Sequence, residues 1–154
     1  MRFEIHSWVH PLCFHTERRL DLIVKHRLWR HFLSGSDPEA ERIYLEHIDK
    51  RIGAQKPLDS YIPAARELFQ SMTANGFKGD PIPVNRDWQL LEGAHRTSLA
   101  YVLGLPLTIA RLDTDHTWPA WGKEWFQEHM PDYLPEILEQ FSQLSLGGHV
   151  TNTL

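Results

Sequence analysis

The sequence is organised around the run Gln89-Leu90-Leu91-Glu92-Gly93-Ala94-His95-Arg96-Thr97. Residues 89–91 form a short apolar segment typical of a strand, and a helix is predicted over 94–103, before Gly104. Gly93 therefore stands between a strand and a helix, where a residue without a Cβ lets a ligand approach the backbone closely. Because the free N–H groups of a first helical turn attract anions, this turn predicts a phosphate site.

The side chains of the turn suit the same ligand. Arg96 offers a planar, permanently charged fork, His95 a donor that titrates near neutrality, and Thr97 a hydroxyl. Glu92 would be repelled by a phosphate unless a cation or a substrate hydroxyl stood between them, so it is a candidate magnesium ligand or general base. The alternative is an ordinary strand–turn–helix in which Arg96 is only an exposed charge.

The flanking segments predict a small sheet between groups of helices. Ile82-Pro83-Val84 and residues 89–91 bracket a turn-prone Asn85-Arg86-Asp87, which indicates a β-hairpin, and Leu107 to Leu112 is typical of a third strand. Apolar residues at helical spacing predict helices over 17–33, from the cap at 36–39 to Gly53, from 59 or 60 to 75, over 121–128 and over 132–144.

We therefore expect an α+β fold formed by one domain over 1–146. Its parts are a mainly helical N-terminal subdomain at 1–76, a small mixed sheet with the phosphate-binding turn at 77–113, and C-terminal helices at 114–146. A chain of 154 residues with 42% apolar content can bury one such core. Residues 147–154 show no periodicity and are expected to form a flexible tail.

Composition restricts the class of partner. The chain has no long apolar run and no secretory-type N-terminus, and Cys13 is its one cysteine, so we expect a cytoplasmic protein without a membrane partner. A formal net charge of −4 and no DNA-reading element argue against nucleic acid. The crowded His6, His10, Cys13 and His15 lack a second ligand pair at regular spacing, which disfavours zinc.

The run from Pro81 to Gly104 resembles the ParB N-terminal and sulfiredoxin-like pattern of a hairpin, a Gly-x-x-Arg turn, an alanine in the helix and a closing glycine. The resemblance implies a nucleotide bound at Gly93 and Arg96, with neighbouring contacts from Ala94, His95 and Thr97. Sulfiredoxins carry a catalytic cysteine where this chain has Ala94, so sulfinic acid repair is not expected. The second nucleotide motif and the helix-turn-helix of the partition proteins are also missing.

In motif chemistry the turn is most similar to the free-serine kinase branch, where an acidic residue precedes Gly-His-His-Arg. Glu92 stands at that position. The resemblance thus implies a phosphotransferase that uses Mg·ATP and acts on a small hydroxylated metabolite, with Glu92 and His95 as catalytic residues and Glu92 as magnesium partner. A nucleotide-binding regulatory module with little turnover is the alternative, and a ParB-like nuclease is disfavoured by the weak basicity.

A basic side of the first helix is a further candidate. Arg19, His26 and Arg30 are separated by seven and four residues, which places them on one side of a helix, and Lys25 is one step around it. These four residues could contact a phosphate or an acidic substrate. A solvated basic face is the favoured alternative.

Tryptophans follow the sheet at helical spacing. Trp118, Trp121 and Trp125 could stack on a base or sugar, or close over the site and exclude water. The favoured alternative is an aromatic seam that docks the C-terminal helices on the sheet.

Overall fold

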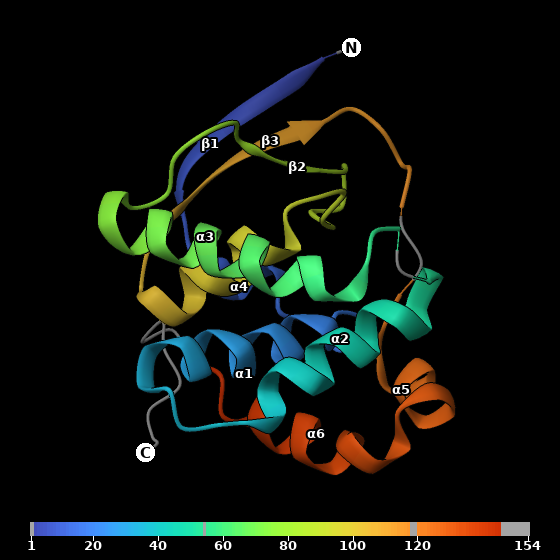
Figure 1. The fold of residues 1–154 in the computed structure, drawn as a ribbon. Helices are drawn as coiled ribbons and strands as arrows, with labels where there is room; N and C mark the ends of the chain where they lie inside the picture. Colours follow the sequence, from blue (N-terminus) through green and yellow to red (C-terminus); the bar gives the residue numbers. More distant parts are fainter. Residues whose placement is uncertain (1, 54, 118–119, 146–154) are drawn as a thin grey trace.

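The computed structural model describes residues 2–53, 55–117 and 120–145. Within them a small sheet lies at one end of the molecule, α3 and α4 lie beneath it, α1 and α2 follow, and α5 and α6 lie at the opposite end (Figure 1). The strands are β1 (Phe3–Val9), β2 (Ile82–Val84) and β3 (Leu107–Leu112), and the helices are α1 (Asp21–Ser34), α2 (Glu39–Ile52), α3 (Tyr61–Asn75), α4 (Ala94–Leu103), α5 (Lys123–His129) and α6 (Leu134–Ser142). Short 3-10 helices occupy Pro11–Phe14, Leu58–Ser60 and Pro131–Tyr133.

The sheet has the strand order β1-β3-β2, with β3 in the middle. β1 runs antiparallel to β3, and β2 runs parallel to it with Ile82 opposite Ile109. Parallel neighbours need a crossover connection, and α4 supplies it. The turn at Gly93 therefore lies where the chain leaves the sheet and enters the crossover helix.

Helix α1 is the centre of the core. It packs against α4 on one side and α2 on another, and most of its side chains are buried. Trp29 is fully buried, and its indole N–H donates to the Ser98 hydroxyl of α4 at 2.9 Å. A buried indole requires such a partner, so this bond fixes α4 against α1 as well as satisfying the ring.

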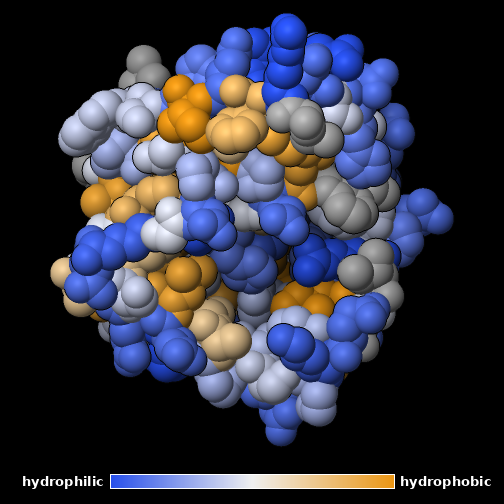
Figure 2. Space-filling model, turned by 90° about the horizontal axis from the view of Figure 1, so that it is seen from above, coloured by the Kyte–Doolittle hydropathy of each residue, from blue (hydrophilic) through white to orange (hydrophobic). Residues whose placement is uncertain are grey.

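The expected α+β class with a small mixed sheet is confirmed, as are helices at each of the predicted positions. β1, however, is not among the strands that the sequence predicts. It is an edge strand in which Phe3, Ile5 and Trp8 are exposed, and hydrophobic and hydrophilic side chains share the face of the molecule seen from the sheet side (Figure 2). Its register shifts between His6 and Val9, which breaks the alternation that marks a regular strand.

The predicted hairpin is only partly correct, because its second arm is reduced to one antiparallel bridge between Val84 and Leu90. The buried Asn85 explains this. Its side-chain oxygen accepts hydrogen bonds from the backbone N–H groups of Asp87 and Gln89, both at 2.9 Å, and closes a tight turn in which Trp88 adopts a φ of 61°. The chain curls toward Gly93 instead of continuing along β2.

The structure does not test the predictions for the tail at 147–154 and for Trp118, because both lie outside the described residues. None of the helices in the described part of the chain is long and apolar enough to cross a bilayer.

A buried pair of histidines joins the N-terminal segment to α1. The Nε2 atoms of His15 and His26 lie 2.8 Å apart, and both rings lie against Tyr101. Burial lowers the pKa of His15 to about 4, and burial together with the neighbouring His15 lowers the pKa of His26 well below its usual value. Near neutral pH both rings are therefore uncharged.

We predict that the protein loses stability as the pH falls from about 6.5 to about 4. These histidines bind protons more weakly in the folded chain than in the unfolded chain, so acid favours unfolding, and His15 alone accounts for roughly 3 kcal/mol at pH 4. Urea unfolding at several pH values measures the slope. His15→Asn should flatten it, whereas His116→Asn, at an exposed position, should leave it unchanged. Equal stability at pH 7 and pH 4.5 would contradict the prediction.

Candidate functional site

The predicted turn opens on a cavity of about 590 Å³. Three arginines line it, and they come from distant parts of the chain: Arg19 from the segment before α1, Arg51 from the end of α2, and Arg96 from α4. The remaining lining residues are Leu90, Leu91, Glu92, Gly93, Ala94, His95 and Trp121. The fold therefore brings the motif and two further cations to one place.

The α4 N-terminus forms one wall of this cavity. Gly93 has a φ of 86° and no side chain caps the helix, whose first hydrogen bond runs from the N–H of Thr97 to the carbonyl of Gly93 at 2.9 Å. The N–H groups of the preceding three residues lie before that bond and are available to an anion. A Cβ on Gly93 would stand 3.0 Å from Ile82, so both backbone conformation and packing require glycine here.

Arg96 is oriented by neutral groups. Its Nη1 donates to the carbonyl of Asp80 at 2.6 Å, and its guanidinium lies 5.1 Å from the centre of the Phe77 ring. Neither partner carries a negative charge. Among the described residues no carboxylate forms an ion pair with Arg96, so its charge is available to a ligand.

His95 differs from the expectation that it titrates near neutrality. Its Nε2 lies 2.7 Å from the Tyr44 hydroxyl. Burial, together with the charges of Lys25 and Arg51, lowers the pKa of His95 to about 3. Burial also raises the pKa of Tyr44 to about 12, so a neutral imidazole and a protonated phenol form the pair near neutral pH.

The other two polar residues of the motif lie at opposite depths. Glu92 is exposed, and it is the one carboxylate among the described residues that line the cavity. Thr97 is fully buried and does not line the cavity, and its hydroxyl has no hydrogen-bond partner among the described residues. The structure therefore places Glu92 at the mouth and Thr97 one helical turn inside.

A buried ion cluster lies beside the cavity, at the start of α1. Arg19 donates to both oxygens of Asp21, each at 2.9 Å, and the Lys25 ammonium is 3.8 Å from the same carboxylate. The side chains of Asp21 and Lys25 are 0% and 1% exposed. Burial alone would raise the pKa of Asp21, but the two cations lower it well below its usual range.

Helix α2 adds His47 and Arg51 to the cluster, one turn apart. Burial lowers the pKa of His47 well below its usual value, as does the charge of Lys25, so the ring is neutral. The guanidinium groups of Arg19 and Arg51 lie 5.7 and 5.3 Å from the centre of the Trp121 ring. Trp121 thus supports both arginines at the cavity wall.

The tryptophans dock on helices rather than on the sheet. Trp121 is tied to the start of α1, because its N–H donates to the carbonyl of Arg18 and its carbonyl accepts from the N–H of Leu20, both at 3.1 Å. The Trp125 ring packs against His47 of α2 at 5.2 Å. The expected seam is therefore present at these two residues but covers α2 and the start of α1.

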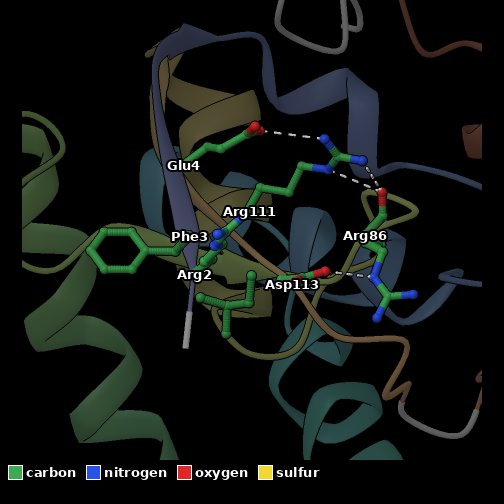
Figure 3. Close-up of a pocket in the computed structure, with 7 residues that line it drawn as sticks. Arg2, Phe3, Glu4, Arg86, Arg111 and Asp113 are labelled. Atoms are coloured by element: carbon green, nitrogen blue, oxygen red, sulfur yellow. Dashed lines mark hydrogen bonds and ion pairs between the residues drawn. The ribbon is translucent and has the colours of Figure 1, made fainter.

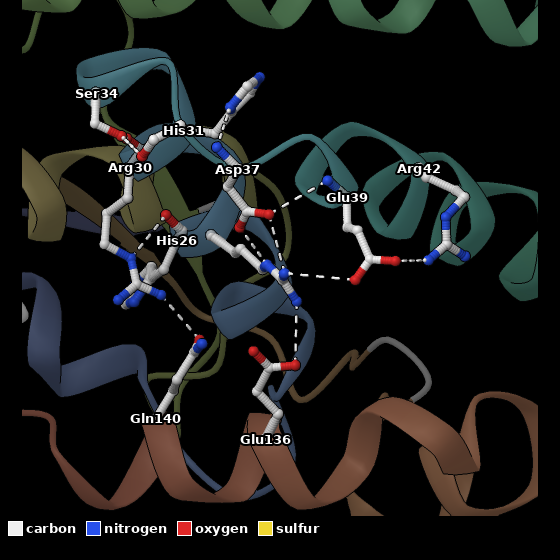
Figure 4. A network of polar contacts seen from close by, with 11 residues as sticks. His26, Arg30, His31, Ser34, Asp37, Glu39, Arg42, Glu136 and Gln140 are labelled. Carbon is white, nitrogen blue, oxygen red and sulfur yellow. Dashed lines mark hydrogen bonds and ion pairs between the residues drawn. The ribbon is translucent and has the colours of Figure 1, made fainter.

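The candidate basic side of the first helix is wrong as a single face. Arg19 lies before α1, which begins at Asp21, so helical spacing does not relate it to the others. Lys25 joins the cluster near the cavity, whereas His26 is buried against His15. Arg30 binds the His26 carbonyl and Gln140 of α6 (Figure 4). The alternative of a solvated face is also wrong for Lys25 and His26, each 1% exposed.

A second cavity of about 670 Å³ lies at the outer edge of the sheet (Figure 3). Three arginines line it, and two of them have acidic partners: Arg86 binds the carboxylate of Asp113 at 2.9 Å, and Arg111 binds the Arg86 carbonyl and the carboxylate of Glu4. These two acids leave only Arg2 of its lining cations without an acidic partner in the lining. The cavity at Gly93 is the better candidate because it has three arginines against one lining carboxylate, and the helix N-terminus beside them.

Sequence reasoning missed Asp21, Tyr44, His47 and Arg51. The i, i+4 spacing of His47 and Arg51 on a predicted helix was the available signal. No group of three or more His, Cys, Asp or Glu side chains suited to a metal ion occurs in the described ranges. No protein family, curated protein or solved structure matches this chain.

Replacing Asp21 tests the buried cluster. Asp21→Asn removes the carboxylate that neutralises Arg19 and Lys25, so we expect a loss of about 3–5 kcal/mol in the free energy of unfolding. Asp113→Asn is the matched control, because it breaks an exposed ion pair with Arg86 and should cost less than about 1 kcal/mol. Urea unfolding of the two variants compares these costs, and equal losses would argue against a buried role for Asp21.

Proposed function

We propose that the protein binds the phosphate groups of a nucleotide in the cavity at Gly93. The observation that carries this proposal is the convergence of Arg19, Arg51 and Arg96 with the α4 N-terminus on a cavity whose one described carboxylate is Glu92. Guanidinium forks and helical N–H groups are the donors that phosphate oxygens prefer. The similarity of the turn to ParB/sulfiredoxin-like nucleotide sites supports the same ligand.

We further propose that the bound nucleotide is ATP and that the protein transfers its terminal phosphoryl group to a small hydroxylated metabolite. Such transfer depends on positioning and charge neutralisation, which the three arginines and the α4 N-terminus would supply. A smaller cavity of about 250 Å³ shares Arg19 and Leu90 with the first. It is below the 300–1,000 Å³ typical of sites for drug-sized ligands, so it suits a small acceptor.

Glu92 and His95 have different roles in this proposal. Glu92, at the mouth, would accept the proton of the acceptor hydroxyl or hold Mg²⁺ together with phosphate oxygens, because magnesium is commonly held by one or two carboxylates plus the substrate. Bound magnesium would neutralise part of the phosphate charge. His95 is neutral and paired with Tyr44, so it would orient the ligand rather than neutralise it.

A regulatory module that binds nucleotide with little turnover is the second candidate. The exposure of Glu92 favours it, since transfer chemistry is commonly carried out where the reacting groups are closed off from water. The two candidates share one binding site and differ only in whether an acceptor is phosphorylated.

Arg96 is the residue whose removal tests nucleotide binding. Arg96→Ala should weaken the affinity for ATP by about 1.5–3 kcal/mol, the range for a hydrogen bond to a charged group. Arg66→Ala removes an exposed arginine of α3 that pairs with Glu41, and it should bind as the wild type does. Titration calorimetry with ATP, ADP and CTP, with and without magnesium, gives the affinities. Unchanged affinity in Arg96→Ala would remove the turn from the site.

Glu92 distinguishes transfer from simple binding. Phosphorus NMR of the wild type with Mg·ATP and a panel of sugars, polyols and amino acids should show a new phosphate ester with one class of acceptor. Glu92→Gln should bind ATP but lower that rate by roughly 100-fold or more, the typical contribution of a general base. Binding without acceptor-dependent turnover in the wild type would support the regulatory module instead.

A further inference from the structure

Several buried polar atoms near the cavity have no hydrogen-bond partner in the described part of the chain. They are Lys25 Nζ, Arg51 Nε and both ring nitrogens of His47. Lys25 is 1% exposed and His47 is fully buried. A buried polar group without a hydrogen bond costs free energy, and a buried charge without full compensation costs more. Such a concentration of unpaired groups indicates a place that a polar ligand completes.

The charge of this cluster gives the sign of that ligand. Arg19, Lys25 and Arg51 are three cations, and Asp21 is the carboxylate that lies among them. Asp21 is already bound by two of the three guanidinium nitrogens of Arg19, and its distance of 3.8 Å from Lys25 is longer than a hydrogen bond. In the described residues no further carboxylate pairs with Lys25 or Arg51, so a ligand that completes the cluster would be an anion.

The cluster is continuous with the cavity wall. Arg19 and Arg51 line the cavity. Burial, together with the charges of Arg51 and Arg19 and against the effect of Asp21, lowers the pKa of Lys25 to about 8. Lys25 and Arg51 act in the same way on His95, which also lines the cavity. Lys25 is thus close to the residues that a ligand in the cavity would contact.

On the basis of the proposed function, we propose that Lys25, His47 and Arg51 form an inner phosphate subsite, and that the turn at Gly93 and Arg96 forms an outer one. Arg51 joins the two subsites, because it lines the cavity and also belongs to the buried cluster with Lys25 and His47. Two joined subsites select a ligand with at least two linked phosphate groups. A single phosphate would satisfy only one set of donors. The ligand class is therefore a di- or triphosphate rather than a monophosphate.

Protonation should accompany binding. The groups facing Lys25 are Asp21 on its own helix, Arg19 before it, His47 and Arg51 on α2, and His95 on α4. An added anion favours the charged ammonium, so it raises the pKa of Lys25 above about 8. Near pH 8 the free protein is only partly protonated at this lysine, and binding therefore takes up roughly half a proton there.

The test uses pyrophosphate and orthophosphate on the full chain, with calorimetry at pH 8 in two buffers of different ionisation enthalpy. The wild type should bind pyrophosphate at least tenfold more tightly than orthophosphate. Lys25→Met should lose most of this preference, and its proton uptake should be lower than that of the wild type. Because the ligand's own protons are the same in both titrations, the difference reports on Lys25.

Lys50→Met is the matched control. Lys50 is an exposed lysine of α2 paired with Glu46, so its removal deletes the same charge outside the cluster. This variant should keep the pyrophosphate preference and the proton uptake of the wild type. Thermal melting shows whether each variant is folded. If Lys25→Met does not fold, Lys25→Arg replaces it, because this variant keeps the charge and should bind pyrophosphate without the uptake.

The outcomes separate this inference from the proposed function. A folded Lys25→Met that matches the wild type in preference and uptake would overturn the inner subsite, and nucleotide binding at Arg96 would remain. The inner subsite is also overturned if Lys25→Arg takes up as many protons as the wild type. A wild-type protein that binds neither pyrophosphate nor ATP would overturn both proposals.

Discussion

The carboxylate of Asp21 holds two cations inside the protein at the start of α1. It accepts two hydrogen bonds from Arg19 and lies 3.8 Å from Lys25, with almost no exposure to water. Burial of three charges is costly unless they stabilise one another, so this carboxylate is the condition for burying Arg19 and Lys25 beside the cavity. Arg19 is fixed by it, and the Trp121 ring lies 5.7 Å from the same guanidinium.

The position of α1 extends this constraint to the rest of the fold. The helix is packed between α2 and α4, and the Trp29–Ser98 bond fixes α4 against it. α4 is also the crossover between β2 and β3, so the same packing places the Gly93 turn next to the cluster. Arg19 before α1, Arg51 on α2 and Arg96 on α4 line one cavity because α1 packs against both α2 and α4.

The sequence predicts local features of this site better than its distant ones. The helix boundaries and the glycine between strand and helix follow from apolar spacing and from the one residue type that tolerates a φ of 86°. β1 was missed because its register shift disturbs the alternation of apolar residues, and the second arm of the hairpin was overestimated because Asn85 closes the turn instead. The spacing of Arg19 and Lys25 predicts a shared helical face that the structure does not contain, since α1 begins after Arg19.

The members of the cluster on α2 show why the remainder could not be predicted. His47 and Arg51 look like ordinary residues of an exposed helix until α1 is packed against it. In the packed structure the charges of the cluster distinguish these residues. Burial keeps the rings of His47 and His95 neutral, while Lys25 and the arginines stay cationic with one internal acid among them. This excess of buried positive charge does not stabilise the fold, because burying apolar side chains of similar size would cost less free energy. Under the proposed function, an anionic ligand would supply the negative charge that compensates this excess.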